Sequence, residues 1–433
     1  MRRQGKILTT AEASTGRGFS LDHRTRRAVR SWVSGHRDEL VDLARHLIRT
    51  ASINHPPGGD EGPLQAWIAD HLRALRAEVE VYEPDHTLGI SSHPDWRPNR
   101  DYHGRPNVFA RLPGVDPRAR SLAFCGHIDT VGLPGDCWTV DPLSATVDGD
   151  HLIGLGSFDM KGSLASAMMA LQAIHQLGLP VSGDVALESV VDEEYGGANG
   201  TLAGRLRNPQ IAGAVLMEPT NLRLCPSHRG GGMWRLVTRG RSGLAFSGEA
   251  VTNPVWALGR ALGALEAERD RRRDAEGNPL TLEVFQLKAG PDWPVGDRVP
   301  ASASAMIWGE TRPDEDPATL EALIRQALAR AGIRSLQISP VIPPMPGNRL
   351  ADDHPLVAAV QQSLRDFALN PDLITAPFAC DGFHFGRAAE TAVIVLGASG
   401  ENAHAADEYV SIDSLMRLTE VLIDLALAWC QSG

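Results

Sequence analysis

The stretch "DVALESVVDEEYGGANG" at residues 184–200 joins an apolar run to three consecutive acidic residues and then to a glycine-rich segment. The apolar run has the length and composition of a buried strand, as in a sheet covered by helices. Asp192, Glu193 and Glu194 stand at its end, where neighbouring negative charges repel one another. A solvated acidic turn explains such a triplet without any function. A divalent cation also explains it, because a cation makes clustered carboxylates stabilising.

Four further apolar runs of strand length occur in the chain, at 107–112, 121–128, 212–218 and 391–398. Helical patterns lie between such runs: a helix from about Thr25 to Thr50, one from about Pro63 to Leu75, and one over 161–177. Buried strands that alternate with helices predict an α/β fold, in which helices cover a sheet in layers. We therefore expect a three-layer domain built on a mixed sheet.

The pattern changes between about residues 229 and 340. The predicted order there is a strand (233–239), a helix (253–272), two strands (281–288 and 302–309), a helix (317–332) and a strand (335–339). This βαββαβ order is a complete small α+β unit, and the apolar-strand pattern resumes after it. We expect a flexible tail over residues 1–20, a discontinuous catalytic domain over 21–228 and 341–433, and an inserted lid or dimerisation-type domain over 229–340.

Composition excludes several classes of partner. The net charge of −11 over 433 residues argues against nucleic acid and against an anionic membrane surface. No apolar run reaches the roughly 18 residues of a membrane-spanning helix. The five cysteines are odd in number and form no CxxC pair, so neither a disulfide framework nor a thiolate zinc site is indicated. A reducing cytoplasm fits this use of cysteine.

Four more segments place a possible metal ligand at the end of a predicted strand or the start of a helix. "CGHIDTV" supplies His127 and Asp129, "GLGSFDMKGS" supplies Asp159, "LMEPT" supplies Glu218, and "GASGENAHAADEYV" supplies His404. Asp129 shares one side of a strand with His127, so its carboxylate can hydrogen-bond the imidazole. Each residue alone has an ordinary explanation, such as a helix N-cap for Asp159. Together they offer zinc ligands at the strand ends, where α/β sheets bind their ligands.

The order HxD, GxxDMKG, DEExGG, EP and HxxDE resembles the M20 metallopeptidases, a group of deacetylases, desuccinylases, aminoacylases and carboxypeptidases. The resemblance extends from about residue 35 to 430. It implies two zinc ions about 3.5 Å apart, for which cobalt can substitute. By position, the implied ligands are His127 and Glu218 on one ion, Glu194 and His404 on the other, and Asp159 between the two. Glu193 is then the general base that takes a proton from the water between the metals.

The lid departs from the family pattern. The stretch that resembles the family's G-K-A-A-H is "RGRSGLAF", in which Leu244 occupies the histidine position, and residues 229–353 contain no histidine. The N-x-V-P element reads "DRVP", so that Asp297 replaces asparagine. Arg312 in "ETRP" is retained as the residue expected to clamp a substrate carboxylate. In the family this histidine stabilises the oxyanion across a dimer interface. Its absence leaves three possibilities: zinc alone stabilises the oxyanion, an arginine such as Arg241 or Arg312 does so, or hydrolysis has been lost; we expect an arginine.

The expected activity is zinc-dependent hydrolysis of an amide in an N-acyl amino acid or a related N-acyl amine. The segments "DEEYGGANGTLA" and "NAHAADEYVSI" are most similar to the deacetylase and deformylase branch of the family. Two alternatives stay open: a dipeptidase or carboxypeptidase of the same family, and a diverged member that forms amides or only binds metal. The expected partners are a small-molecule amide substrate and a second copy of the chain, which would pair through the lid domain.

Overall fold

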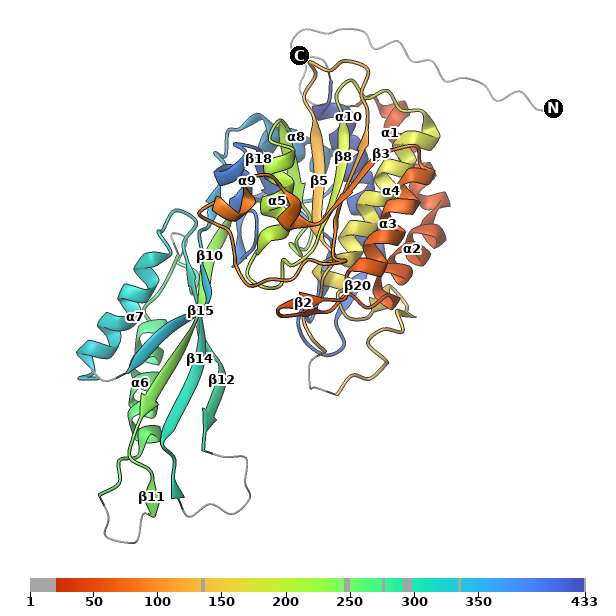
Figure 1. Cartoon of the computed structure of the whole chain (residues 1–433). Coiled ribbons are helices and arrows are strands. Elements are labelled where there is room, and N and C mark those ends of the chain that lie inside the picture. The colour runs from red at the N-terminus through yellow and green to blue at the C-terminus, as the bar shows by residue number, and fades with distance from the viewer. Residues whose placement is uncertain are drawn as a thin grey trace, which may run out of the picture.

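The computed structural model describes residues 21–133, 137–244, 250–274, 277–290, 298–333 and 336–431. The tail expected over residues 1–20 lies outside the described residues. Figure 1 shows a large α/β body from which a narrower arm projects. We call this arm the lid; it consists of the second half of strand β10 and the elements that follow it as far as β15.

The body is built on a mixed sheet. Its strands lie in the spatial order β18 (Ala392–Val395), β9 (Gly213–Leu216), β5 (Leu122–His127), β8 (Val185–Val190), β4 (Asn107–Leu112) and β3 (Glu78–Tyr82). The first four are parallel, whereas β4 and β3 pair antiparallel. The predicted apolar runs coincide with these strands to within a few residues, so the mixed sheet is confirmed.

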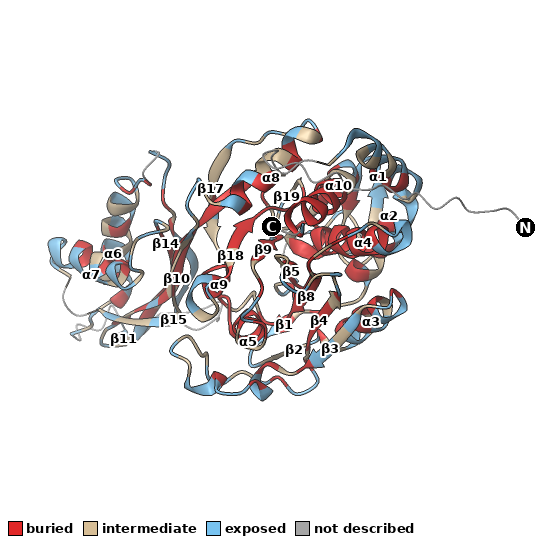
Figure 2. Ribbon diagram, turned by 90° about the horizontal axis from the view of Figure 1, so that it is seen from above, coloured by how far each residue is buried: buried red, intermediate tan, exposed pale blue. Residues whose placement is uncertain are grey.

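Helices cover both faces of this sheet (Figure 2). One face carries α1 (His23–Gly35), α2 (Arg37–Arg49), α3 (Gly62–Ala74), α4 (Gly162–Leu177), α8 (Pro355–Asp366) and α10 (Ile412–Trp429); the other carries α5 (Asn199–Arg207) and α9 (Phe383–Ala388). Strand β5 serves both layers, because successive side chains of a strand point to opposite faces. Leu122 and Phe124 join the first core, and Ala123 and Cys125 join the second.

The single helix predicted from Thr25 to Thr50 is wrong. The chain leaves the helical conformation at His36, where φ is −114° and ψ is 20°. The backbone N–H of His36 closes α1 on the carbonyls of Trp32 and Val33, and its imidazole Nδ1 lies 2.7 Å from the Trp32 carbonyl oxygen. The apolar spacing continues across this break, since both helices bury their faces in the same core. Periodicity alone therefore could not reveal it.

Strand β10 (Leu224–Arg239) connects the body to the lid. Its first part pairs with β16 (Asn348–Arg349), β17 (Leu373–Ala379) and β18, and its second part pairs with β14 (Ser302–Thr311) and β15 (Gln337–Met345). The expected strand at 233–239 is thus the outer half of a longer one. Glycines allow it to continue: a Cβ at Gly230 would lie 2.5 Å from Oγ1 of Thr311 and 2.6 Å from the Met345 carbonyl oxygen.

Within the described residues, helices cover one side of the lid sheet. Strand β12 (Leu282–Ala289) forms its outer edge beside β14. Helices α6 (Pro254–Arg269) and α7 (Ala318–Arg330) pack on one face through Leu258, Leu265 and Ile324, among others. At the far end of the lid, the short strands β11 (Gly243–Leu244) and β13 (Arg298–Val299) pair with each other (Figure 1).

Among the helices of the described residues, none is both long enough and apolar enough to cross a membrane.

Candidate metal centre

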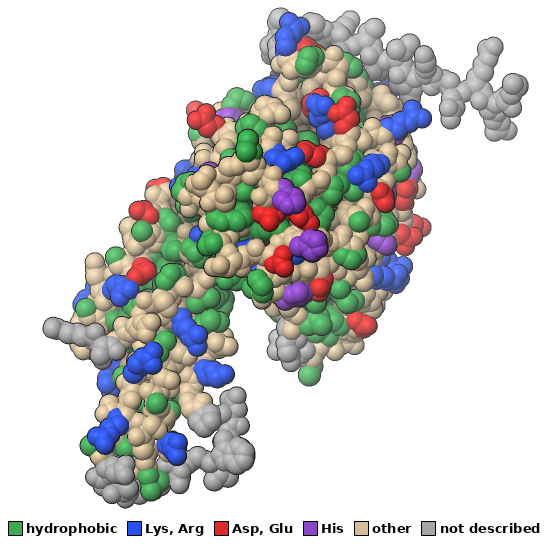
Figure 3. Space-filling view, viewed as in Figure 1, with side chains coloured by type: hydrophobic (Ala, Val, Ile, Leu, Met, Phe, Trp, Pro, Cys, Tyr) green, Lys and Arg blue, Asp and Glu red, His purple; other side chains and the backbone are tan. Residues whose placement is uncertain are grey.

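The carboxyl ends of the parallel strands bring the predicted ligands together. His127 is the last residue of β5, Glu193 and Glu194 follow β8, and Glu218 follows β9. Asp159 lies in the turn before α4, and His404 lies between β19 (Gly400–Glu401) and β20 (Tyr409–Ser411). Figure 3 shows histidine and acidic side chains gathered at this end of the body.

Asp159 stands between the two histidines. Its Oδ1 is 3.1 Å from Nε2 of His127, and its Oδ2 is 3.2 Å from Nε2 of His404. His404 Nε2 is also 3.1 Å from Oε2 of Glu194, and His127 Nε2 is 3.9 Å from Oε2 of Glu218. Each half of the site therefore has one imidazole and one carboxylate of its own, with Asp159 shared between them.

The side chains present fit a pair of cations. The Oε1 atoms of Glu194 and Glu218 are buried and have no hydrogen-bond partner within the described part of the chain. An unpaired buried acceptor is costly, and a metal ion would satisfy both atoms. Imidazole nitrogen and carboxylate oxygen are ligands that zinc accepts. This donor set contains no thiolate.

The electrostatics of the cluster point the same way. Burial, together with repulsion from Glu218, raises the pKa of Glu193 well above its usual value. Burial raises the pKa of Glu218 well above its usual value too. Attraction to Glu194 raises the pKa of His404 well above its usual value, although partial burial opposes this shift. Groups that crowd negative charge in this way are stabilised by bound cations.

Asp129 differs from its predicted role. The Nδ1–H of His127 donates to the backbone carbonyl of Asp129 at 2.9 Å, while the Asp129 carboxylate lies 3.6 Å from Nδ1. The carboxylate instead accepts the backbone N–H groups of Glu193 at 3.1 Å and Glu194 at 2.9 Å. Asp129 therefore fixes the imidazole tautomer through its main chain and holds the acidic loop through its side chain.

Asp192, the first acid of the triplet, points away from the metal ligands. It is fully buried and accepts hydrogen bonds from Tyr102 Oη at 2.6 Å, Arg100 Nε at 2.8 Å, Asn54 Nδ2 at 3.0 Å and Arg105 Nη2 at 3.2 Å. Asn54 Nδ2 also lies 2.8 Å from Oδ2 of Asp129. The strand end thus uses its three carboxylates in three ways, and the first anchors the loop that carries the other two.

Replacing Asp192 with asparagine is expected to destabilise the protein by about 3–5 kcal/mol, because removing one partner of a buried ion pair leaves uncompensated charge. Arg105 keeps its second carboxylate partner Glu61, whereas Arg100 keeps only Asn54 Oδ1 at 2.8 Å and has no second carboxylate partner among the described residues. Denaturant unfolding measures the effect. Asp70→Asn is the control: the exposed Asp70–Arg73 pair should contribute at most about 1 kcal/mol. Equal losses in the two variants would contradict the anchoring role.

Glu408 supports the site and was not predicted. Its buried carboxylate accepts the backbone N–H groups of Gly156 at 2.7 Å, Phe158 at 2.9 Å and Asp159 at 2.9 Å. Burial raises its pKa to about 7. The available signal was the motif HxxDE, of which Glu408 is the last residue. It fixes the turn that presents Asp159.

Asp381 is a second acid that the motifs did not reveal. It follows β17 and is 1% exposed; Thr201 donates to its Oδ2, and its Oδ1 has no partner among the described residues. Ligand atoms of Asp381, Cys380 and Glu218 lie within 4.8 Å of one another. Burial raises the pKa of Asp381 to about 6. Nothing before it predicted a strand, so its place beside Glu218 could not be foreseen.

The predicted lid residues do not join this cluster in the structure. Arg312 is exposed directly after β14, and its backbone N–H donates to Glu315 Oε2 at 3.2 Å. Asp297 lies outside the described residues. Leu244 is on β11, which Figure 1 shows at the end of the lid furthest from the body. Leu244 is therefore remote from the candidate metal ligands of the same chain.

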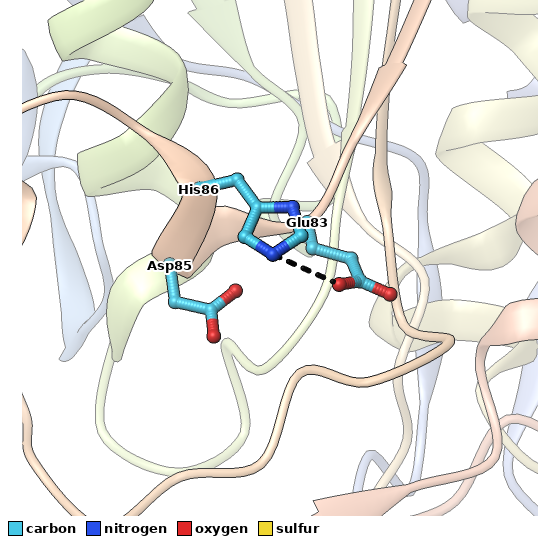
Figure 4. A group of neighbouring side chains, drawn as sticks. All are labelled: Glu83, Asp85 and His86. Carbon is cyan, nitrogen blue, oxygen red and sulfur yellow. Dashed lines mark ion pairs between the residues drawn. The ribbon is translucent and has the colours of Figure 1, made fainter.

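A different group of side chains also combines histidine with carboxylates. Glu83, Asp85 and His86 lie on and beside the turn Pro84–His86, with His86 Nε2 at 3.5 Å from Glu83 Oε2 (Figure 4). Asp85 and His86 are exposed, and none of the three side chains has a buried atom without a partner. These three residues form a surface cluster, which serves below as a control.

Known proteins are similar to this chain both in sequence and in fold. The N-formyl-4-amino-5-aminomethyl-2-methylpyrimidine deformylase of Bacillus subtilis (strain 168) is 26% identical over 431 residues, covering 92% of this chain and 96% of that protein. The succinyl-diaminopimelate desuccinylase of Methylobacterium radiotolerans is 29% identical over 396 residues, covering 89% and 95%.

Solved structures agree with the fold. The dipeptidase Dug1p from Saccharomyces cerevisiae superposes with a TM-score of 0.78 at 14% identity, covering 95% of this chain and all of that one. The YXEP protein of Bacillus subtilis, described as a dinuclear metal-binding peptidase, has a TM-score of 0.60 at 15% identity, covering 91% and 98%. Residues 123–428 of this chain match the family model of peptidase family M20/M25/M40. The chain belongs to this family of metal-dependent hydrolases, and its expected class, amide-bond hydrolysis, is confirmed.

Proposed function

We propose that the site holds two zinc ions and releases the acyl group from an N-acyl amino acid or a related N-acyl amine. The single observation that carries this proposal is Asp159, whose two carboxylate oxygens lie 3.1 Å and 3.2 Å from two different imidazoles. His127 and Glu218 would hold one ion, and Glu194 and His404 the other. Cobalt, which takes similar ligands, is expected to replace zinc.

The mechanism assigns separate tasks to the chain's own residues. Bound metal ions would polarise the amide carbonyl and lower the pKa of the attacking water. Glu193 lies beside the ligands His127 and Glu218, so its carboxylate can accept the proton of that water and pass it to the leaving nitrogen. Asp129 holds the backbone of Glu193 and Glu194. The products are a carboxylate and an amine.

A substrate panel tests the reaction class. Zinc-loaded protein should turn over N-formyl, N-acetyl or N-succinyl amines with a higher kcat/KM than dipeptides of matched size. The two relatives named as deformylase and desuccinylase support this order, and the similarity to a dipeptidase concerns the fold only. Faster turnover of dipeptides would favour the peptidase alternative. Absence of turnover across the panel would contradict hydrolysis.

We also propose that Arg312 replaces the missing lid histidine as the group that meets oxyanion charge or a substrate carboxylate. Residues 229–353 offer no histidine, and an arginine is always charged with several donors. Arg312→Ala is expected to lower kcat by about 10²–10³-fold. Arg325→Ala, which removes an exposed lid arginine paired with Glu321, is the control. An unchanged kcat in Arg312→Ala excludes this role. Asp297 is proposed as a second lid residue that contacts the substrate.

A homodimer through the lid is the proposed assembly. Edge strand β12 exposes Phe285 (60%) and Leu287 (63%), and the neighbouring α6 exposes Trp256 (71%). An unpaired edge strand with exposed apolar side chains favours pairing with another chain. Light scattering should give twice the mass of one chain, and Phe285→Glu with Leu287→Glu should give one. A monomeric wild type contradicts the dimer.

The free cysteines support the proposal of a cytoplasmic location.

A further inference from the structure

One face of the lid sheet carries no helix among the described residues, and strand register shows which side chains it carries. Trp234 and Leu236 of β10 point toward the lid helices, so Arg235, Val237 and Arg239 point to the opposite side. Directly paired residues of neighbouring antiparallel strands share a face. The same face therefore carries the following partners: Met306 opposite Arg235, Ser304 opposite Val237, Ser302 opposite Arg239, and Lys288 opposite Ser304.

This face carries positive charge that nothing within the described residues neutralises. Arg235, Arg239 and Lys288 are exposed, and none forms an ion pair or side-chain hydrogen bond with another described residue. The same registers place two acids on this side, and both already have partners: Glu283 pairs with Arg269 at 3.2 Å, and the buried Glu310 pairs with Arg229 at 3.0 Å. Basic side chains gather over the lid on the face shown in Figure 3, in a chain of net charge −11.

The basic face begins beside the loop that carries Glu193 and Glu194. Ile342 of β15, paired with Met233 of β10, packs against the loop that carries Glu193 and Glu194. A Cβ at Gly196 in that loop would lie 2.3 Å from Cγ2 of Ile342. Counting along β10 from Met233 at about 3.3 Å per residue, Arg235 lies about 7 Å further out and Arg239 about 20 Å.

We propose that this face, Arg235, Arg239 and Lys288, binds the non-reacting part of an extended substrate that carries two or more carboxylates. The proposal rests on the proposed hydrolysis of an N-acyl amine and names the class of its substrate. Arginine presents a planar fork that pairs with both oxygens of a carboxylate. Arg235 and Arg239 stand about 13 Å apart along the strand, too far to clamp a single anion. A chain of several acidic groups, such as an acidic peptide, matches this spacing.

The experiment compares two substrates that differ only in tail charge. The acyl group found active in the panel is attached to amidated Glu-Glu-Glu and to amidated Gln-Gln-Gln, and kcat/KM is measured for each. Three exposed ion pairs should together give the Glu tail an advantage of about 3- to 150-fold in kcat/KM. Arg235→Gln with Arg239→Gln should remove most of this advantage. Arg260→Gln, an exposed arginine on α6, should keep it.

A second measurement separates this proposal from the hydrolytic one. Labelled oligoglutamate is titrated into metal-chelated wild type, the double arginine variant and Arg260→Gln, with fluorescence anisotropy as the readout. Oligoglutamate binding that depends on Arg235, without turnover of any N-acyl amine, would support carboxylate binding by this face and contradict hydrolysis. Turnover without a preference for the Glu tail would contradict the proposed role of this face and leave hydrolysis intact. A preference that the double variant retains would do the same. Tighter competition by tripolyphosphate than by unlabelled oligoglutamate would overturn its assignment to carboxylates.

Discussion

Glu193→Gln is expected to lower kcat by about 10²–10⁴-fold, the usual contribution of a general base, while metal content stays at the wild-type level. Glutamine keeps the size of the side chain and loses the ability to accept a proton. Ligand atoms of Glu193, His127 and Glu218 lie within 4.8 Å of one another, so the base stands beside the proposed ligands. Steady-state kinetics and elemental analysis of the same preparation measure both quantities.

Glu194→Gln is the matched comparison, because it makes the same chemical change one residue along the chain. Oε2 of Glu194 lies 3.1 Å from His404 Nε2, and its Oε1 is buried without a partner among the described residues. This variant should lose metal first and activity as a consequence, so that excess zinc partly restores its rate. If excess zinc restored Glu193→Gln as well, or if both variants bound metal like wild type, the division of tasks between the two glutamates would be wrong.

Local sequence patterns predicted the body strands because burial on both faces produces continuous apolar runs. They also predicted which side chains meet, because the parallel strands place their carboxyl ends along one edge. His127, Glu194 and Glu218 are far apart in the chain and lie at or just after the ends of three different strands of one sheet. The predicted strand ends therefore located most of the candidate ligands.

Other features depend on contacts that local patterns do not encode. Arg100, Tyr102 and Arg105 come from a long irregular segment, and only the folded chain shows that they converge on Asp192. The continuation of β10 through Gly230 depends on how closely Thr311 and Met345 approach it. Glycine in a sequence indicates a break as readily as close packing, so the join between body and lid could not be located from composition.

The stabilisation of Asp192 also explains why an acidic triplet can end a buried strand. Two arginines and a tyrosine hold the first carboxylate, and the second and third remain beside the histidines. The backbone N–H groups of Glu193 and Glu194 are fixed by Asp129. Repulsion among the three carboxylates is therefore reduced because they point in different directions. Asp192 faces Arg100 and Arg105, and Glu193 and Glu194 face the place where metal ions would bind.

Asp159→Asn is expected to have the largest effect on metal content, because each histidine approaches a different oxygen of this one carboxylate. Zinc-loaded wild type should contain about two ions per chain, as in two-metal hydrolases. His127→Ala and His404→Ala should each lose about one ion, whereas Asp159→Asn should weaken both and reduce the content toward zero after dialysis. Glu83→Gln, in the surface cluster of Figure 4, is the control and should retain both ions. Two separate single-metal sites would predict the opposite ranking, with Asp159→Asn losing no more than either histidine variant. Elemental analysis of the four variants beside wild type distinguishes a shared ligand from two independent sites. Wild type that stays metal-free in excess zinc would contradict the assignment of a metal site.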